Sequence, residues 1–384
     1  MLTSATNIDE LVGKFQVEDA MLRYSSFIPR LYNYCRALGF EPGRMLPSRA
    51  FCSDENQGYP TILIAKHFGT FPFNHGRGGA IVATQRHGPF AEHGQDLVII
   101  QASHVGYDHE TGAFGTYSRI HAGTGEHTAS CGKLAAVLAW YQREYRFAQA
   151  NVLLERCHGH LCVRIDNGLL RGNRREGLFL DLARLVVPDA DGRFVPRHTH
   201  STAKSFPACP ALQRQYAGLD LGEGQRVAMG ERLTAPMFTF RRELDDTVEG
   251  RDHQEASLIL AMPWIVTSAS PLLTAAQINT QVEFDRAFRT AAQTSSYRDK
   301  RLLHIAGLNI DISPQPGETF PTTHFVPWAA YVQDRDGQRI LEQPELVAAL
   351  RAQSAENPDE IDLEAAIRAM SEADLIRVGV APGG

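Results

Sequence analysis

The chain has 384 residues, a formal net charge of −6 at pH 7 and 43% hydrophobic residues. A chain of this length buries a substantial core, either in one large domain or in two ordinary ones. The acidic balance argues against nucleic acid or an anionic membrane as a partner. The six cysteines are too few for a disulfide scaffold in so long a chain, so we expect free thiols and a cytoplasmic location.

The N-terminal segment shows helical periodicity between Asp9 and Leu38, with apolar residues three and four positions apart. It has no basic region followed by an apolar run, and the chain has no apolar stretch of about 18 residues. We therefore expect no signal peptide and no membrane span. Residues 1–45 are predicted to form a helical arm that wraps a partner subunit.

Two short apolar runs, Tyr59 to Ala65 and Asp96 to Ala102, are predicted to be buried parallel strands. Cys52 precedes the first run in a loop, and His104 falls in a polar turn just after the second. An amphipathic helix is predicted to begin at Cys131, because apolar residues follow it at helical spacing: Leu134, Val137, Leu138, Tyr141 and Tyr145. The positive end of that helix is expected to lower the pKa of the Cys131 thiol.

Cys52, His104 and Cys131 together have the chemistry of one zinc site. Two thiolates and an imidazole suit a tetrahedral ion, and three protein ligands leave the fourth position open to water. Positions near strand ends and at a helix start match the usual location of sites in open α/β sheets. Spacing alone leaves an alternative open, because buried cysteines are often inert small hydrophobic residues.

Several ordered motifs between Ser48 and Trp140 point to a known family. They are Phe-Pro-Phe-Asn-His-Gly-Arg-Gly-Gly-Ala at 71–80, Arg-His-Gly-Pro at 86–89, Ser-His-Val-Gly-Tyr at 103–107, Gly-Ala-Phe-Gly-Thr-Tyr-Ser-Arg at 112–119 and Ser-Cys-Gly-Lys-Leu at 130–134. This pattern resembles the Cys/Gly/His-rich domain of the limiting-CO2-inducible B/C proteins, also called theta-class carbonic anhydrases. The resemblance implies an α/β fold like that of the beta-class carbonic anhydrases, with a largely parallel central sheet flanked by helices. It also implies zinc (Zn2+) held by Cys52, His104 and Cys131, and a homodimer or higher homo-oligomer.

Asp54 follows Cys52 by two residues, a Cys-x-Asp unit similar to that of the beta class. Its carboxylate is a candidate to orient a hydroxide on zinc or to occupy the open zinc position itself; the alternative is a cap on a local turn. In the beta class an arginine later in the loop holds this aspartate, whereas this chain has Asn56 there. Arg119 is the candidate replacement, and its alternative is a solvated surface arginine.

His127 is the rival to His104 as the zinc ligand. Beta-class enzymes place the histidine three residues before the second cysteine, and His127 lies four residues before Cys131. His104 is preferred because the Ser-His-Val-Gly segment is one of those that carry the resemblance. His127 then shuttles protons or faces solvent.

Beyond residue 150 the chain shows less resemblance to the family. We predict a strand and turn at 151–164, a long loop at 188–210, strands at 256–262 and 302–310, and an acidic helix at 359–375. Cys157 and Cys162 are a second possible metal pair, but an odd separation of five places them on opposite faces of a strand. We divide the chain into the arm, a zinc-binding catalytic domain at 46–330 and a C-terminal helical extension at 331–384.

The function implied by the resemblance is reversible hydration of CO2 to bicarbonate, a zinc lyase activity that uses hydroxide on the metal. The small apolar substrate predicts a narrow pocket lined by side chains such as Phe71, Phe73, Val105 or Phe114. Two alternatives stay open. One is a catalytically silent zinc-binding homologue that binds bicarbonate or a partner in inorganic-carbon handling. The other is a zinc hydrolase of another small heterocumulene such as carbonyl sulfide.

Overall fold

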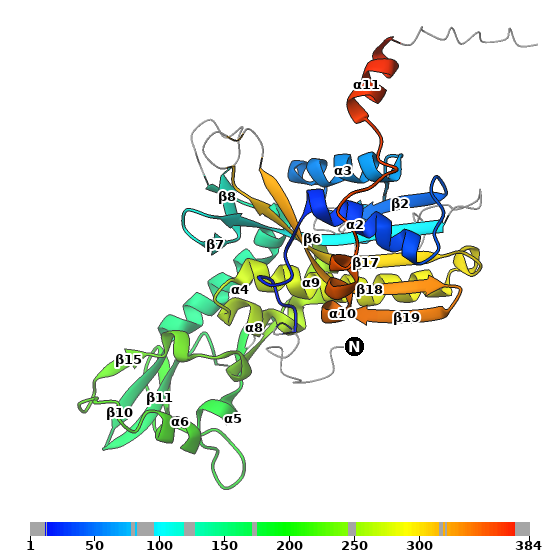
Figure 1. Cartoon of the computed structure of the whole chain (residues 1–384). Coiled ribbons are helices and arrows are strands. Elements are labelled where there is room, and N and C mark those ends of the chain that lie inside the picture. Colours follow the sequence, from blue (N-terminus) through cyan, green and yellow to red (C-terminus); the bar gives the residue numbers. More distant parts are fainter. Residues whose placement is uncertain are drawn as a thin grey trace, which may run out of the picture.

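A computed structural model of the protein contains two main β-sheets, which lie at opposite ends of helix α4 (Gly132–Asn151) (Figure 1). The structure describes residues 12, 14–77, 81–82, 96–118, 127–170, 175–244, 251–314, 318 and 321–372. Within this part of the chain, no helix combines the length and the apolar character needed to cross a membrane.

The larger sheet has eight strands and a parallel centre. Its main path runs in the order β1 (Leu22–Arg23), β18 (Thr322–Asp334), β17 (Leu302–Ile312), β6 (Asp96–Asp108), β2 (Met45–Ala50) and β3 (Phe73–Asn74). The four strands from β17 to β3 pair in parallel, whereas β18 pairs antiparallel with β1, β17 and β19 (Gly337–Glu342). The short β7 (Ala113–Phe114) pairs antiparallel with β6. The expected largely parallel central sheet is confirmed, with antiparallel strands added at one edge.

Helices cover both faces of this sheet, which is why its central strands are nearly continuous apolar runs. Alternate residues of β6 point to opposite faces: Val98 and Ile100 belong to one hydrophobic cluster, and Leu97 and Ile99 to another. The first cluster contains side chains of α2 (Tyr24–Ala37), α3 (Gly58–Phe68) and α10 (Gln343–Arg351). The second contains side chains of the long α9 (Pro271–Gln293), against which α4 also packs.

The smaller sheet has five antiparallel strands and follows α4 in the chain. Its order is β13 (His198–Thr199), β14 (Ala203–Pro207), β11 (His160–Asp166), β10 (Val152–Cys157) and β15 (Arg226–Ala228). Short helices α5 (Leu182–Leu185) and α6 (Pro210–Gln215) lie beside it (Figure 1). The predicted strand and turn at 151–164 is confirmed as the β10–β11 hairpin, whereas the predicted loop at 188–210 contains two strands of this sheet.

The remaining elements are short pairs and connecting helices. The two-stranded pairs are β4 (Gly76–Arg77) with β5 (Ile81–Val82), β8 (Thr116–Ser118) with β9 (His127–Ala129), and β12 (Gly177–Leu180) with β16 (Phe238–Arg241). The helices are α7 (Arg251–Leu258), α8 (Met262–Thr267), α11 (Leu363–Glu372) and the 3-10 turns η1 (Glu55–Gln57), η3 (Gly230–Arg232), η4 (Ala235–Met237), η5 (Ile259–Ala261) and η6 (Ser295–Tyr297).

Several predicted elements are confirmed, and two predicted strands are wrong. The strands at 96–102 and 302–310 and the helices starting at Cys131 and within 359–375 are present. The run Tyr59 to Ala65 is helix α3 instead of a strand, and 256–262 spans the end of α7, η5 and the start of α8. A short apolar run does not distinguish a buried strand from a buried helix by its period. The division at residues 45 and 330 stays a prediction.

Candidate metal centre

The structure brings Cys52, His104 and Cys131 together at the carboxyl ends of β2 and β6. Cys52 follows β2, His104 lies within β6 and Cys131 caps the N-terminus of α4. One ligand atom from each lies within 4.8 Å of the other two, and all three residues are buried. Among the described residues this is the one group of three or more such side chains with that geometry. The prediction that His104 sits in a turn is wrong, because β6 continues six residues beyond Ala102.

Two glycines allow the backbone to close around these residues. A Cβ at Gly106 would lie 2.8 Å from the Cβ of Ser130, the residue before Cys131. A Cβ at Gly76 would lie 2.2 Å from the carbonyl oxygen of Phe51, the residue before Cys52. Side chains at either position would push apart the segments that carry the two thiols. Gly78 and Gly79, which follow in the same motif, lie outside the described residues.

The buried carboxylate of Asp311, in β17, holds the ring of His104. His104 Nδ1 donates to Asp311 Oδ2 at 2.8 Å, and both side chains are buried. Ser130 Oγ donates to the same oxygen at 3.0 Å and lies 3.2 Å from Nδ1. A hydrogen bond of this kind fixes the imidazole tautomer with its proton on Nδ1, which leaves the Nε2 lone pair free for a ligand.

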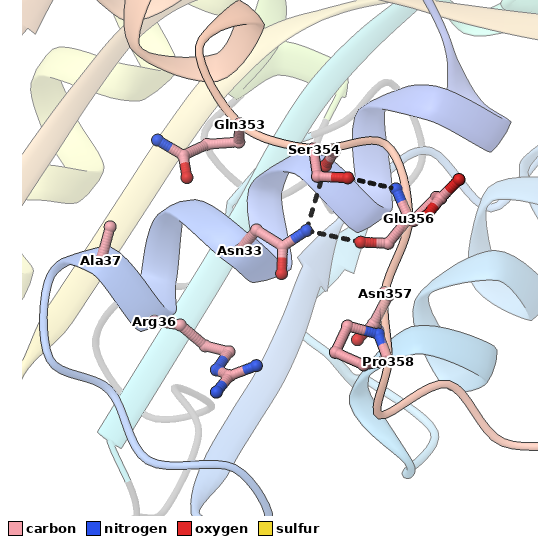
Figure 2. A pocket seen from close by; sticks show the side chains of 8 residues that line it. All are labelled: Asn33, Arg36, Ala37, Gln353, Ser354, Glu356, Asn357 and Pro358. Carbon is pink, nitrogen blue, oxygen red and sulfur yellow. Dashed lines mark hydrogen bonds between the residues drawn. The ribbon is translucent and has the colours of Figure 1, made fainter.

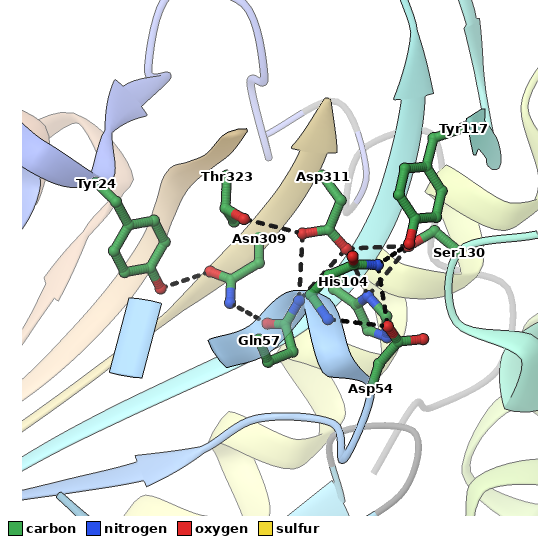
Figure 3. Close-up of polar contacts among 10 residues, drawn as sticks. Tyr24, Asp54, Gln57, His104, Tyr117, Ser130, Asn309, Asp311 and Thr323 are labelled. Carbon is green, nitrogen blue, oxygen red and sulfur yellow. Dashed lines mark hydrogen bonds and ion pairs between the residues drawn. The ribbon is translucent and has the colours of Figure 1, made fainter. Parts of the chain in front are cut away.

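A chain of polar side chains extends from Asp311 to helix α2 (Figure 3). Gln57 Nε2 donates to both oxygens of Asp311, at 3.2 and 3.3 Å, and Thr323 Oγ1 donates to Oδ1 at 3.2 Å. Asn309 Nδ2 donates to Gln57 Oε1, and the hydroxyl of Tyr24 donates to Asn309 Oδ1 at 2.7 Å. The sequence motifs gave no signal for these residues, because each lies outside the Cys and His motifs.

Asp54 lies beside this group and caps η1. Its Oδ1 accepts from the backbone N–H of Asn56 at 3.2 Å and from Asn56 Nδ2 at 3.0 Å, and Asn56 Nδ2 also donates to the hydroxyl of Tyr117. Figure 3 shows Asp54 on the side of His104 away from Gln57 and Asn309. A neutral amide therefore contacts the aspartate where the family resemblance led us to look for an arginine.

The pKa values of the ligand side chains reflect their mutual contact. Burial disfavours a charge on His104, but Cys131 and the hydrogen bond to Asp311 outweigh it, so the pKa of His104 is raised above its ordinary value. A hydrogen bond with Cys52, together with burial, raises the pKa of Cys131. In the protein alone, these two effects outweigh the lowering that the helix start was expected to produce. A divalent cation between the sulfurs would act in the opposite direction and deprotonate them.

The donor set fits a soft divalent ion. Among the described residues, Nε2 of His104 is a buried polar atom that has no hydrogen-bond partner. A buried polar atom of this kind is costly unless something binds it. Two sulfurs and one imidazole nitrogen are the ligands expected for zinc. Cys131 also adopts a left-handed φ of 59°, a strained conformation that non-glycine residues hold most often at functional sites.

The other predicted site residues have different surroundings. His127 Nδ1 lies 3.2 Å from Asp108 Oδ2, and its side chain is 40% exposed. Arg119 lies outside the described residues. Val105 is buried in the same hydrophobic cluster as Cys52 and Cys131, whereas Phe71 is 69% exposed.

Cys157 and Cys162 form a second thiol pair, and the prediction that they face opposite ways is wrong. They belong to different strands of the β10–β11 hairpin, whose register pairs Glu155 with Cys162. Because Cys157 follows Glu155 by two residues, both thiols lie on one face. Cys157 Sγ donates to the buried Glu155 Oε1 at 3.3 Å, and Arg226 Nε donates to Oε2 at 2.9 Å. We refer to Cys157 and Cys162 as the hairpin thiol pair.

A separate surface cavity of about 770 Å³ lies between α2 and the segment after α10 (Figure 2). It is lined by Asn33, Arg36, Ala37, Gln353, Ser354, Glu356, Asn357 and Pro358. Asn33 Nδ2 donates to the carbonyl oxygens of Ser354 and Glu356, at 3.0 and 2.8 Å. These bonds fix the C-terminal segment on α2, and no predicted site residue lines the cavity.

Comparisons with known proteins give one family match and several similar solved structures. Residues 21–154 match the family described as limiting CO2-inducible proteins B/C beta carbonic anhydrases. The crystal structure of PtLCIB4, a homolog of the limiting CO2-inducible protein LCIB, has a TM-score of 0.50 and 13% identity, covering 88% of this chain and 99% of that chain. The crystal structure of LCIB itself has a TM-score of 0.46 and 12% identity, covering 88% and 100%. No curated protein matches the sequence.

The fold and the buried residues define an α/β protein of the beta-carbonic-anhydrase-like class, with a Cys-His-Cys group that can hold a metal ion. Within that class, residues 21–154 match the family of the limiting CO2-inducible proteins B/C. The resemblance inferred from the sequence motifs is thereby confirmed.

Proposed function

We propose that this protein is a zinc-dependent carbonic anhydrase that reversibly hydrates CO2 to bicarbonate. The observation that carries the proposal is the buried Nε2 of His104, which has no hydrogen-bond partner among the described residues and is grouped with two cysteine sulfurs. This group lies in the segment matched by a family whose description includes beta carbonic anhydrases.

In this proposal Cys52 and Cys131 bind zinc through their sulfurs, and His104 binds through Nε2. When bound, zinc supplies a nucleophile near neutral pH by lowering the pKa of a water ligand to about 7. Two thiolates and a neutral imidazole balance the two positive charges of the ion. The buried apolar surroundings, which include Val105, exclude bulk water and suit a small apolar substrate.

Asp54 is the proposed catalytic carboxylate. Its Oδ1 is held by Asn56, and in this proposal the carboxylate accepts a hydrogen bond that orients the attacking hydroxide toward CO2. Arg119 stays a proposed second partner of Asp54. The proposal also includes a homodimer or higher homo-oligomer in the cytoplasm, where the thiols stay reduced.

The test combines metal analysis with stopped-flow CO2 hydration on the purified protein. We expect zinc to copurify with the wild type and hydration to exceed the buffer rate, and we expect Cys52→Ser to lose both. Zinc at full content with no rate above buffer contradicts the enzyme proposal. The same preparation tested on carbonyl sulfide separates CO2 hydration from hydrolysis of a related heterocumulene.

A second candidate is a silent zinc-binding homologue that binds bicarbonate or a partner in inorganic-carbon handling. The contact that favours it is the neutral Asn56 amide on Asp54 Oδ1, where the beta class has an arginine. An amide supplies a hydrogen bond but no charge, so it steadies the carboxylate less firmly than a guanidinium does. Zinc without hydration activity, together with bicarbonate binding by calorimetry, supports this candidate.

A further inference from the structure

Asp311 is a fully buried carboxylate in β17 that contacts each of the three segments carrying the candidate ligands. We propose that Asp311 is the common positioning residue of the metal centre, which fixes His104 directly and the segments of Cys52 and Cys131 through one intermediary each. The inference rests on the proposed metal centre and adds a residue that lies far from every ligand in the sequence.

The direct contact sets the direction of the ligand ring. His104 Nδ1 donates to Asp311 Oδ2 at 2.8 Å, so the proton stays on Nδ1 and the Nε2 lone pair points to the two sulfurs. The partner is 207 residues away in sequence, but the parallel pairing of β6 and β17 places Asn309 opposite His104 and Asp311 opposite Gly106. The strand register therefore brings the carboxylate to the ring.

The segments of the two cysteines reach Asp311 through side chains next to them in the chain. Ser130, which precedes Cys131, donates from Oγ to Oδ2 at 3.0 Å. Gln57, which ends the turn η1 after Cys52, donates from Nε2 to both carboxylate oxygens. A shift of Asp311 would therefore loosen all three ligand segments together.

A second layer keeps the carboxylate and its partners in place. Thr323 Oγ1, from the neighbouring β18, donates to Oδ1 at 3.2 Å. Asn309 donates to Gln57 Oε1, so the Gln57 amide group turns its Nε2 toward Asp311. The hydroxyl of Tyr24 in turn donates to Asn309 Oδ1 at 2.7 Å. Buried polar networks whose members are satisfied in this way are rigid and specify one arrangement.

The expected effect is on metal affinity. Carboxylates that accept the second ring proton of a metal-binding histidine raise its basicity, and their removal typically weakens metal affinity about 10- to 100-fold. Asp311→Asn keeps the shape of the side chain but removes its charge, and its NH2 group cannot accept from His104, Ser130 or Gln57. We expect zinc to bind the variant within this range of weaker affinity.

The test measures the zinc dissociation constant of the full chain by competition with a chromophoric chelator. The matched control is Asp108→Asn, because Asp108 is also a buried carboxylate at the end of β6, and its described partners, Glu110, Thr111 and His127, lie outside the proposed ligand set of Cys52, His104 and Cys131. We expect unchanged affinity in the control. Cobalt(II) absorption gives a second readout, since a changed imidazole ligand shifts the cobalt bands and a purely structural role for Asp311 does not.

The outcomes separate this inference from the proposed function. A wild type that binds no zinc contradicts the metal centre itself. A wild type that binds zinc, with equal affinity in Asp311→Asn, overturns only the role of Asp311; so does an equal loss in both aspartate variants. Should Asp311→Asn fail to fold, Ser130→Ala removes only the hydrogen bond from Ser130 to Asp311. We expect this loss of one hydrogen bond to weaken zinc binding about three- to tenfold. Unchanged affinity in Ser130→Ala then overturns the inference.

Discussion

Two groups in this chain combine cysteines with nearby polar residues, and their surroundings differ. In the metal centre of Cys52, His104 and Cys131, the Nε2 atom of His104 has no hydrogen-bond partner among the described residues. In the hairpin thiol pair, Cys157 donates to Glu155, whose carboxylate also accepts from Ser205 and Arg226. Protein atoms satisfy the Glu155 carboxylate of the second group, whereas the first group has one nitrogen lone pair, on His104 Nε2, without a hydrogen-bond partner among the described residues.

This difference teaches that residue types alone do not define a metal site. Both groups have two buried thiols, and the hairpin also has His158 and His160 close by in sequence. What distinguishes the first group is an unpartnered lone pair, held in direction by a carboxylate on the opposite side of the ring. The charge of the Glu155 carboxylate is already compensated by Arg226, so this carboxylate attracts a metal cation less strongly.

The largest expected effect separates the two thiol groups by metal content. Cys52→Ser removes a proposed zinc ligand, so we expect zinc to fall from about one ion per chain to near zero. Cys162→Ser changes the hairpin thiol pair and leaves the zinc content unchanged. Mass spectrometry of acid-digested protein measures both. Equal zinc loss in the two variants breaks the comparison.

A second pair of variants tests which histidine, His104 or His127, binds zinc. His104→Ala removes the nitrogen that faces the sulfurs, and we expect zinc to be lost. His127→Ala removes a half-exposed ring that contacts Asp108, and we expect zinc to be retained. The same metal analysis applies, and loss of zinc only from the His127 variant reverses the assignment.

Substitutions at Asp54 and Asn56 test whether the metal centre is catalytic as well as able to bind zinc. Asp54→Ala removes the carboxylate proposed to orient the attacking hydroxide, so we expect CO2 hydration to fall about 100-fold at unchanged zinc content. Asn56→Ala removes the hydrogen bond to Asp54 Oδ1, and we expect a smaller decrease of about tenfold. Stopped-flow measurements on zinc-loaded variants give both rates. A rate that is independent of both residues excludes the proposed role of Asp54.

The smallest expected effect concerns the stability of the protein in acid, and it depends on Glu155, which lies beside the hairpin thiol pair. Burial tends to raise the pKa of Glu155, but hydrogen bonds from Ser205, Cys157 and Arg226 lower it below its ordinary value. A depressed folded-state pKa adds stability above the unfolded-state pKa of about 4.3, and that stability is lost as the pH falls through the folded-state value. We therefore expect Glu155→Gln to be less stable than wild type at pH 7. As the pH falls from 5 to 3, we expect the free energy of unfolding to decrease less in the variant than in wild type. Urea unfolding across this range measures the difference, and parallel pH profiles contradict it.

The sequence predicted the parts of the fold with strong local patterns. The residues after Cys131 have a helical period, and the run Asp96 to Ala102 is rich in β-branched residues; the predicted helix and strand are both present. Tyr59 to Ala65 failed because seven mostly apolar residues have no diagnostic period. In the structure they follow η1, which Asp54 caps, and they lie in α3, which ends at Gly69 with φ 72°.

The ligand residues were recognisable from the sequence, whereas the network behind them was not. Cys52, His104 and Cys131 belong to motifs that resemble a family, and Cys131 lies at the helix start that the pattern indicated, whereas His104 lies within β6. Asp311 contacts His104 across 207 residues, and only the pairing of β6 with β17 brings them together. A single sequence carries no local signal for such a contact, because it depends on strand order and register.

The central claim is that two sulfurs and one imidazole nitrogen of this chain share a zinc ion. X-ray absorption at the zinc edge of the purified protein tests it most directly. The account predicts a first shell with two sulfurs at about 2.3 Å and nitrogen or oxygen neighbours at about 2.0 to 2.1 Å, with the sulfur count falling to one in Cys131→Ser. A zinc shell without sulfur, or a wild-type protein that binds no zinc, would contradict it.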